Sequence, residues 1–322
     1  MRIIINHHLS LYHLGGGERW VIGVANELIK RGHDVEIYTV PLKVAGGVPI
    51  DNLKELLNGI PYKEGYHHFT DGDVNYVTYH PLSGFNFTTK GKVIKGIHAT
   101  TCWESVDLSY GFLPVVVQLL HKVIGVSELK RADAIHTVAP YLKIDHPHVY
   151  KIPNYVDSEI LIPYPKPKKF TITFASRKSY QKGWDRFQEL QEKFKNDKDI
   201  VFKVSGNIPE KDMPRFIAES HLGVVPSRYD SFGLSIVEFL LTETPVITTK
   251  LESHEALNMP IIYADDLLTM TTWIDTLKKK WYKSRENYIQ FTKQFRQKAL
   301  IYDKKTTMDK LENMFTEVHS RE

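Results

Sequence analysis

Two carboxylates stand eight residues apart in the stretch PSRYDSFGLSIVEFLLTETPVITT, residues 226–249. Asp230 precedes a Phe-Gly-Leu sequence, and Glu238 follows one turn into an apolar helix, which the i, i+3, i+7 pattern beginning at Leu234 predicts. The first amides of such a helix are N-terminal donors that the helix dipole reinforces, and they suit a diphosphate. The amides expected to be open in this way belong to Ser231, Phe232, Gly233 and Leu234.

The two carboxylates would flank that diphosphate. Glu238 is a good acceptor for the vicinal hydroxyls of a ribose, and Asp230 could accept hydrogen bonds from a sugar on the other side. The pattern therefore indicates a nucleotide-sugar. The alternative interpretation makes Asp230 a turn or N-cap residue and Glu238 a solvated helix residue.

A second group of charges follows the predicted strand 170–175 in ASRKSYQKGWD, residues 175–185. Arg177 and Lys182 are cations at the end of this strand, and fixed cations can pair with a departing diphosphate. They would do the electrostatic work that a divalent ion does in metal-dependent transferases. Alone, the same two residues are also consistent with ordinary surface charge.

The composition is that of a globular protein with two domains. The 322 residues are 42% hydrophobic and 25% charged, and the net charge of +4 is spread along the chain, unlike that of a dedicated nucleic-acid binder. The single cysteine, Cys102, excludes internal disulfides and a Cys-based zinc site. Neither a signal peptide nor a membrane-spanning run is evident, so we expect a cytoplasmic protein.

Strands and helices alternate in both halves of the sequence. Residues 2–5, 20–29 and 34–40 read as strand, helix and strand, which is a βαβ unit and implies a parallel sheet. A run of prolines between residues 153 and 167 interrupts the pattern, and a long polar helix or helix pair begins at Arg285. Further strands are expected at 75–79, 93–97, 134–138, 149–152, 170–175, 200–204, 222–225, 245–249 and 260–263.

This alternation predicts an α/β fold with two doubly wound, Rossmann-like domains and a cleft between the carboxyl ends of their sheets. The N-terminal domain, residues 1–152, would serve the acceptor, and residues 153–290 would bind the donor. Residues 291–322 would form a helical segment that crosses back to the first domain.

The chain resembles the retaining glycosyltransferases of family 4, the group 1 glycosyltransferases with the GT-B fold. The Asp230 to Glu238 stretch resembles their Glu-x(seven)-Glu motif, and Arg177 with Lys182-Gly183 resembles their Arg and Lys-Gly pair. Asp230 replaces the usual glutamate and is one methylene shorter. Other resemblances lie at GGGERW (15–20), RGHDVEIYT (31–39), KGIHATT (95–101) and VYKIPNYVD (149–157).

This resemblance implies a metal-independent enzyme that moves a hexose from a UDP- or GDP-sugar to a glycan, lipid or small-molecule acceptor, with no cofactor besides the donor. It assigns catalytic roles to Arg177, Lys182, Asp230 and His98. It assigns donor binding to Gly15, Gly16, Gly17, Arg177, Lys182, Gly206, Ser231, Phe232, Gly233, Leu234 and Glu238.

Some alternatives stay open. A GT-B hydrolase or epimerase, or a non-catalytic nucleotide-sugar-binding module, would share the same donor site. The pairs His7-His8, His67-His68 and His146-x-His148 lack the spacing of a zinc site, so no metal is expected. The apolar segment 112–131 is either a helix packed on the first sheet or a helix resting on an anionic membrane, which would place the protein at the inner membrane surface.

Overall fold

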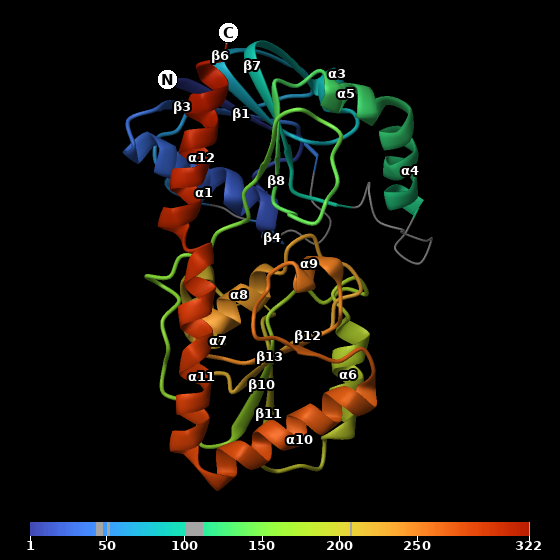
Figure 1. Cartoon of the computed structure of the whole chain (residues 1–322), viewed down its shortest axis with the longest axis vertical. Coiled ribbons are helices and arrows are strands. Elements are labelled where there is room, and N and C mark those ends of the chain that lie inside the picture. The colour runs from blue at the N-terminus through green and yellow to red at the C-terminus, as the bar shows by residue number, and fades with distance from the viewer. Residues whose placement is uncertain (43–47, 50–51, 101–111, 207, 322) are drawn as a thin grey trace. The chain divides into compact units, whose positions relative to one another are not determined.

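The computed structural model describes residues 1–42, 48–49, 52–100, 112–206 and 208–321. It divides into two compact units (Figure 1). Unit 1 comprises residues 1–153 and 307–322, and unit 2 comprises residues 154–306. The C-terminal residues thus belong to the same unit as the N-terminus, whereas residues 291–306 belong to unit 2.

Unit 1 is built on a parallel sheet of seven strands in the order β5-β3-β1-β6-β7-β8-β9. Buried and exposed positions alternate along the first part of β6, as expected for a strand, and every residue from Val74 to Thr78 is buried. The strands are β1 (Arg2–His7), β3 (Asp34–Thr39), β5 (Tyr62–Glu64), β6 (His68–Thr78), β7 (Phe87–Ile97), β8 (Ala134–Thr137) and β9 (Val149–Lys151). A short antiparallel pair joins β2 (His13–Leu14) to β4 (Val48–Pro49).

The helices of unit 1 include a first helix that starts earlier than the sequence predicts. Helix α1 (Gly16–Lys30) has Gly15 as its N-cap, so the expected glycine turn is in part the first turn of the helix. The other helices are α2 (Leu53–Leu57), α3 (Ser83–Asn86), α4 (Phe112–Leu120), the π-helical turn η2 (His121–Gly125), α5 (Val126–Lys130) and α12 (Lys304–His319).

Helix α12 lies beside α1 in unit 1 (Figure 1). Arg31, at the end of α1, donates from Nη1 to Asp309 Oδ1 at 2.8 Å and to Glu312 Oε2 at 2.7 Å. Phe315, further along the same helix, is fully buried and packs edge-on against Tyr76. Apolar burial and ion pairs at the rim therefore both tie the C-terminal segment to the N-terminal sheet.

Unit 2 contains a second parallel sheet, of five strands in the order β11-β10-β12-β13-β14. Every residue of the central strand β10 is buried, as expected for a strand covered on both faces. The strands are β10 (Phe170–Phe174), β11 (Ile200–Val204), β12 (Leu222–Val225), β13 (Val246–Thr248) and β14 (Ile262–Tyr263).

The core of unit 2 gathers aromatic and aliphatic side chains around β10. Phe174 packs on Trp184 and Phe187, and Trp281 closes the same cluster. The helix that carries Trp281, α10, was not predicted from the sequence, whereas the expected polar helix pair is α11 and α12. The helices of this unit are α6 (Trp184–Lys193), η3 (Glu210–Asp212), α7 (Met213–Ala218), α8 (Leu234–Leu241), α9 (Glu252–Glu255), α10 (Leu267–Lys283), α11 (Arg285–Ala299) and η4 (Leu300–Tyr302).

Candidate functional site

The carboxyl ends of β10 and β12 bring the two charged motifs of unit 2 together. Lys182 lies in the loop after β10 and Asp230 in the loop after β12, and Lys182 Nζ donates to Asp230 Oδ2 at 2.8 Å. Both side chains are largely buried, with 17% and 12% of their surface exposed. Adjacent parallel strands place their following loops at one edge of a sheet, where doubly wound folds bind ligands.

The two loops are held against each other by several contacts. Arg228 forms a bidentate ion pair with Asp185, at 2.7 and 2.6 Å, and its backbone amide donates to Gln181 O at 2.9 Å. Gly183 has a φ of 71°, and a Cβ at this position would lie 2.0 Å from Pro226 O. Only glycine therefore allows the approach that places Lys182 beside Asp230.

Asp230 also organises its own loop. Its Oδ1 accepts hydrogen bonds from the amides of Gly233, at 3.2 Å, and Phe232, at 3.4 Å. Two of the four amides expected to be open are thus engaged by Asp230, and the expectation was wrong for these two. Asp230 is thus a turn residue, as the alternative interpretation predicts, and it also pairs with Lys182.

His254 is a third member of this cluster, and the sequence analysis missed it. The ring is fully buried, and its Nδ1 lies 2.9 Å from Thr248 Oγ1 and 3.0 Å from Thr249 O. Its Nε2 lies 3.8 Å from Asp230 Oδ2. The only local signal was its position six residues beyond the end of a strand, which is too general to single it out.

The electrostatics of this cluster favour the ionised form of Asp230. Burial alone would raise the pKa of the Asp230 carboxyl, but the ammonium of Lys182 and the ring of His254 outweigh burial. They hold the pKa well below its ordinary value. The carboxylate is therefore charged and is held in place by Lys182 and by the amides of its own loop.

The remaining predicted donor-site residues of unit 2 lie around this pair. Arg177 is exposed in the loop that follows β10, and Gly206 follows β11 at the same edge. Glu238 is half-buried on α8, one turn after Leu234, and Ser231 lies within the loop that Asp230 organises. The structure thus places all of these residues at or beside one edge of the sheet.

In unit 1 the predicted glycine motif is fixed by Glu18. Its Oε2 accepts from the amide of Gly15 at 2.8 Å, which is a capping-box contact, and its Oε1 lies 3.1 Å from His7 Nε2. Glu18 and His7 are both buried. Gly16 and Gly17 therefore form the first turn of α1 beside the end of β1. The Gly-x-x-Glu spacing was the signal that could have identified Glu18.

His98 follows β7 and is half-buried among aromatic side chains. Its Nε2 lies 2.8 Å from Tyr76 Oη, and its ring centroid lies 4.3 Å from that of Trp20. Burial, together with the nearby rings of His136, His7 and His8, lowers the pKa of His98 well below its ordinary value. The imidazole is neutral near pH 7, as expected for a group that hydrogen-bonds a sugar hydroxyl.

His7 and His8 both contact the hydroxyl of Thr78, and three of the other paired histidines are engaged by backbone carbonyls. His67 Nδ1 lies 2.8 Å from Phe85 O, His68 Nε2 lies 2.8 Å from Thr39 O, and His146 Nε2 lies 3.0 Å from Ala132 O. Within the described residues, no group of three or more His, Cys, Asp or Glu side chains is arranged to hold a metal ion.

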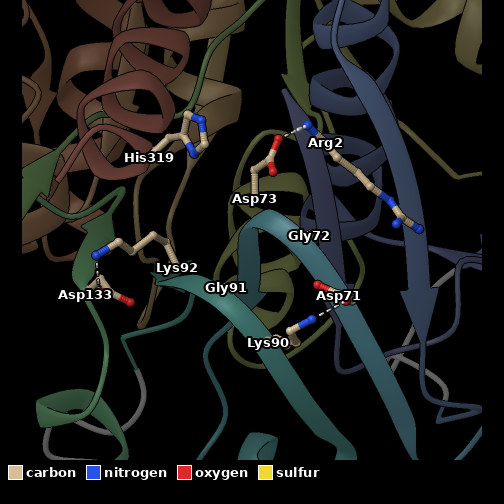
Figure 2. Close-up of a pocket in the computed structure, with 9 residues that line it drawn as sticks. All are labelled: Arg2, Asp71, Gly72, Asp73, Lys90, Gly91, Lys92, Asp133 and His319. Carbon is tan, nitrogen blue, oxygen red and sulfur yellow. Dashed lines mark hydrogen bonds and ion pairs between the residues drawn. The ribbon is translucent and has the colours of Figure 1, made fainter. Parts of the chain in front are cut away.

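A polar hollow of ≈ 680 Å³ opens elsewhere in unit 1, where β1 and β8 begin (Figure 2). Its charges are paired with one another. Lys90 forms an ion pair with Asp71 at 3.0 Å, and Lys92 forms one with Asp133 at 3.6 Å. The backbone amide of Arg2 donates to the carboxylate of Asp73. The hollow lies at the end of the sheet opposite to His98, and its self-compensated charge gives no preference for a ligand of either sign.

Comparison with known proteins identifies the domain in unit 2. Residues 164–268 match the family model described as glycosyl transferases group 1. This confirms the resemblance at the level of group 1, while family 4 remains a prediction. A search of curated protein sequences found no match.

Solved structures match nearly the whole chain at low sequence identity. A glycosyltransferase from Rickettsia africae ESF-5 has a TM-score of 0.70 at 15% identity, with 99% of each chain covered. HepE from Anabaena, in complex with UDP and glucose, has a TM-score of 0.70 at 15% identity, and the match covers 97% of this chain and 99% of HepE. Sucrose-phosphate synthase from Thermosynechococcus elongatus has a TM-score of 0.67 at 13% identity, and the match covers 99% of both chains. These similarities confirm the predicted GT-B fold.

In the part of the chain that the structure describes, no helix combines the length and the apolar character needed to cross a bilayer.

Proposed function

We propose that this chain, whose residues 164–268 match the family model of the group 1 glycosyl transferases, transfers a hexose from a nucleoside diphosphate sugar to a hydroxyl acceptor. The observation that carries the proposal is the 2.8 Å contact between Lys182 Nζ and Asp230 Oδ2. It joins the two charged motifs within the segment that matches the family. A similarly folded relative has been seen with UDP and with UDP-glucose, so a UDP-sugar is the first donor to test and a GDP-sugar the second.

In this proposal Lys182 and Arg177 stabilise the charge that develops on the departing diphosphate. An ammonium carries three N–H donors, so Lys182 can contact Asp230 and a phosphate oxygen together. Asp230 accepts hydrogen bonds from hydroxyls of the sugar, and Glu238 accepts hydrogen bonds from the ribose hydroxyls. The amino end of α8 faces the phosphates. Side-chain cations take the role of a metal. The acceptor hydroxyl attacks the anomeric carbon on the face from which the diphosphate leaves, so its oxygen forms the new bond as the bond from carbon to phosphate oxygen breaks. The leaving phosphate oxygen takes the proton of the hydroxyl, and attack on this face gives retention at the anomeric carbon.

The test is nucleotide release from a panel of UDP-, GDP- and ADP-sugars, each with and without EDTA. We expect release from one donor class, unaffected by the chelator, and reduced about tenfold in Arg177→Ala. This effect is smaller than that of a buried donor because Arg177 is exposed.

The same assay separates the alternatives. A glycosidic product identifies a transferase, whereas release of free sugar identifies a hydrolase. Donor binding without turnover, even in the presence of candidate acceptors, would indicate a non-catalytic nucleotide-sugar-binding module. Loss of activity in EDTA that added Mg²⁺ restores would refute metal independence.

We further propose that the helix from Phe112 to Lys130 contacts an anionic membrane, where a lipid-linked acceptor would reside. Phe112, Leu119 and Val123 are 74%, 58% and 77% exposed, and their spacing places them along one helical face. The exposed Lys122 and Lys130 stand beside this apolar face. An apolar stripe flanked by lysines is typical of helices that lie in the membrane interface.

The membrane proposal is tested by co-sedimentation with phosphatidylglycerol and phosphatidylcholine vesicles. We expect binding to the anionic vesicles only, weakened at least about tenfold by Leu119→Glu with Val123→Glu. Ile289→Glu, at a 40% exposed position of α11, is the matched control and should bind like the unmodified chain. Equal binding of all three proteins would contradict the proposal.

A further inference from the structure

Three side chains of unit 1 form an unbroken hydrogen-bonded series that ends at His98. His98 Nε2 lies 2.8 Å from Tyr76 Oη, and Tyr76 Oη lies 2.6 Å from His136 Nδ1. His136 Nε2 lies 2.8 Å from the carbonyl oxygen of Ile152. Tyr76 and His136 are both fully buried, so water does not compete for these contacts.

The direction of each hydrogen bond follows from the carbonyl end. A carbonyl oxygen only accepts, so His136 carries a proton on Nε2. Burial lowers the pKa of His136 to about 4, so the ring is neutral near pH 7 and its Nδ1 accepts. Burial also raises the pKa of Tyr76 well above its ordinary value, so Tyr76 keeps its proton and donates it to His136 Nδ1.

The oxygen of Tyr76 is then left to accept from its other neighbour. That neighbour is His98 Nε2, which must carry the single proton of the neutral ring. His98 Nδ1 consequently holds a lone pair. In the described part of the chain this atom has no hydrogen-bond partner of its own, and the ring is only half-buried.

We propose that Tyr76 and His136 are positioning residues that fix His98 as the Nε2-protonated tautomer, so that its Nδ1 accepts a hydrogen bond from a substrate hydroxyl. The hydroxyl belongs either to the donor sugar or to the acceptor. This inference rests on the proposed function, since it assigns the chemistry that the histidine offers to a sugar.

The surrounding packing holds the ring in place. Trp20 covers His98, with ring centroids 4.3 Å apart. A Cβ on Gly96, two residues before His98, would lie 1.9 Å from Tyr76 Oη, so glycine is needed for the hydroxyl to reach both histidines. Tyr76 in turn packs on Phe315 of α12. The ring plane and the proton position of His98 are therefore both set by the fold.

The tautomer is measured directly by nitrogen-15 NMR of the full chain labelled at histidine. The signals of His98 are assigned by their loss in His98→Gln. We expect a pyridine-type Nδ1 and a pyrrole-type Nε2 in the unmodified chain, and a mixture of tautomers in Tyr76→Phe. Tyr79→Phe is the matched control, because Tyr79 contacts a different histidine, His121, and should leave the signals of His98 unchanged.

A protonated Nδ1 in the unmodified chain would overturn the proposal, and so would a His98 spectrum that Tyr76→Phe leaves unaltered. The spectrum of the unmodified chain decides the first point even if the variant does not fold. In a folded Tyr76→Phe, we expect kcat/KM to fall about tenfold, the loss of one hydrogen bond.

Titrations distinguish the two sources of the hydroxyl. A shift of the His98 Nδ1 signal with UDP-glucose but not with UDP assigns the contact to the donor sugar. A shift that appears only when methyl glucoside is added to the UDP complex assigns it to the acceptor. No shift in a protein that releases UDP from UDP-glucose would overturn the substrate contact. The predicted tautomer in a protein that turns over no donor would refute the proposed function alone.

Discussion

Replacing Lys182 by methionine is expected to lower kcat about 10²–10³-fold, the usual effect of removing one preorganised electrostatic donor. Methionine keeps the length of the side chain but removes the charge that would meet the departing diphosphate. It also leaves the largely buried Asp230 without its ammonium partner. Because Lys182 helps to lower the pKa of Asp230, the variant should also move that pKa upward. Steady-state kinetics with the donor selected by the release assay measure the effect.

Two variants make this result specific. Lys250→Met removes an exposed lysine that pairs with Glu255 at 3.2 Å, and it should leave kcat within about twofold. Glu238→Ala should raise the donor KM more than it lowers kcat, because a ribose contact is made equally in the ground and transition states. An Lys182→Met enzyme that kept its kcat, with only a raised KM, would place Lys182 in binding rather than in leaving-group stabilisation.

The double variant Lys182→Met with Asp230→Asn tests whether the two residues act as one unit. If Asp230 is held in place by Lys182, the double variant should lose little more activity than Lys182→Met alone. Additive losses would show that the two side chains act independently.

The sequence predicted the elements of unit 2 better than their contacts. The apolar runs at β10 and β12 and the helical pattern of α8 are local signals, and the structure contains all three elements. The contact between Lys182 and Asp230 joins residues 48 positions apart. It depends on the adjacency of β10 and β12 and on the bare backbone of Gly183, and neither is visible in a single loop sequence.

Unit 1 shows the same limit. The strand expected at 75–79 carries Tyr76, and the structure contains it as the C-terminal part of the longer strand β6, which pairs with β1 and β7. The register of β6 against β7 shifts between Asp71 and Val74, and the part of β6 before this shift was not predicted. Tyr76 and His136 both lie in predicted strands, but their contacts with each other and with His98 depend on the adjacency of β6, β7 and β8, which the sequence does not show.

Glu18→Ala is expected to destabilise unit 1 by about 1–3 kcal/mol, the typical cost of leaving a buried hydrogen-bonding group without its partner. The carboxylate and the imidazole of His7 are 2% and 3% exposed, and the same carboxylate accepts from the amide of Gly15 at 2.8 Å. Alanine at position 18 would leave the imidazole of His7 and the amide of Gly15 without this hydrogen-bond partner. Hydrogen exchange followed by mass spectrometry of peptides from each unit measures the change where it occurs.

The matched control lies in the same helix. Glu27→Ala removes surface contacts to Lys30 and Arg31, at 3.6 and 3.8 Å, and should cost about 1 kcal/mol or less. Burial alone would raise the pKa of Glu18, but the hydrogen bond and charge of His7 outweigh it and lower that pKa. The stabilisation by Glu18 is therefore present above about pH 4.3, the ordinary value for glutamate, and is lost as the pH falls through the lower folded pKa. Equal destabilisation by both variants would show that Glu18 is not the fixed point of the glycine motif.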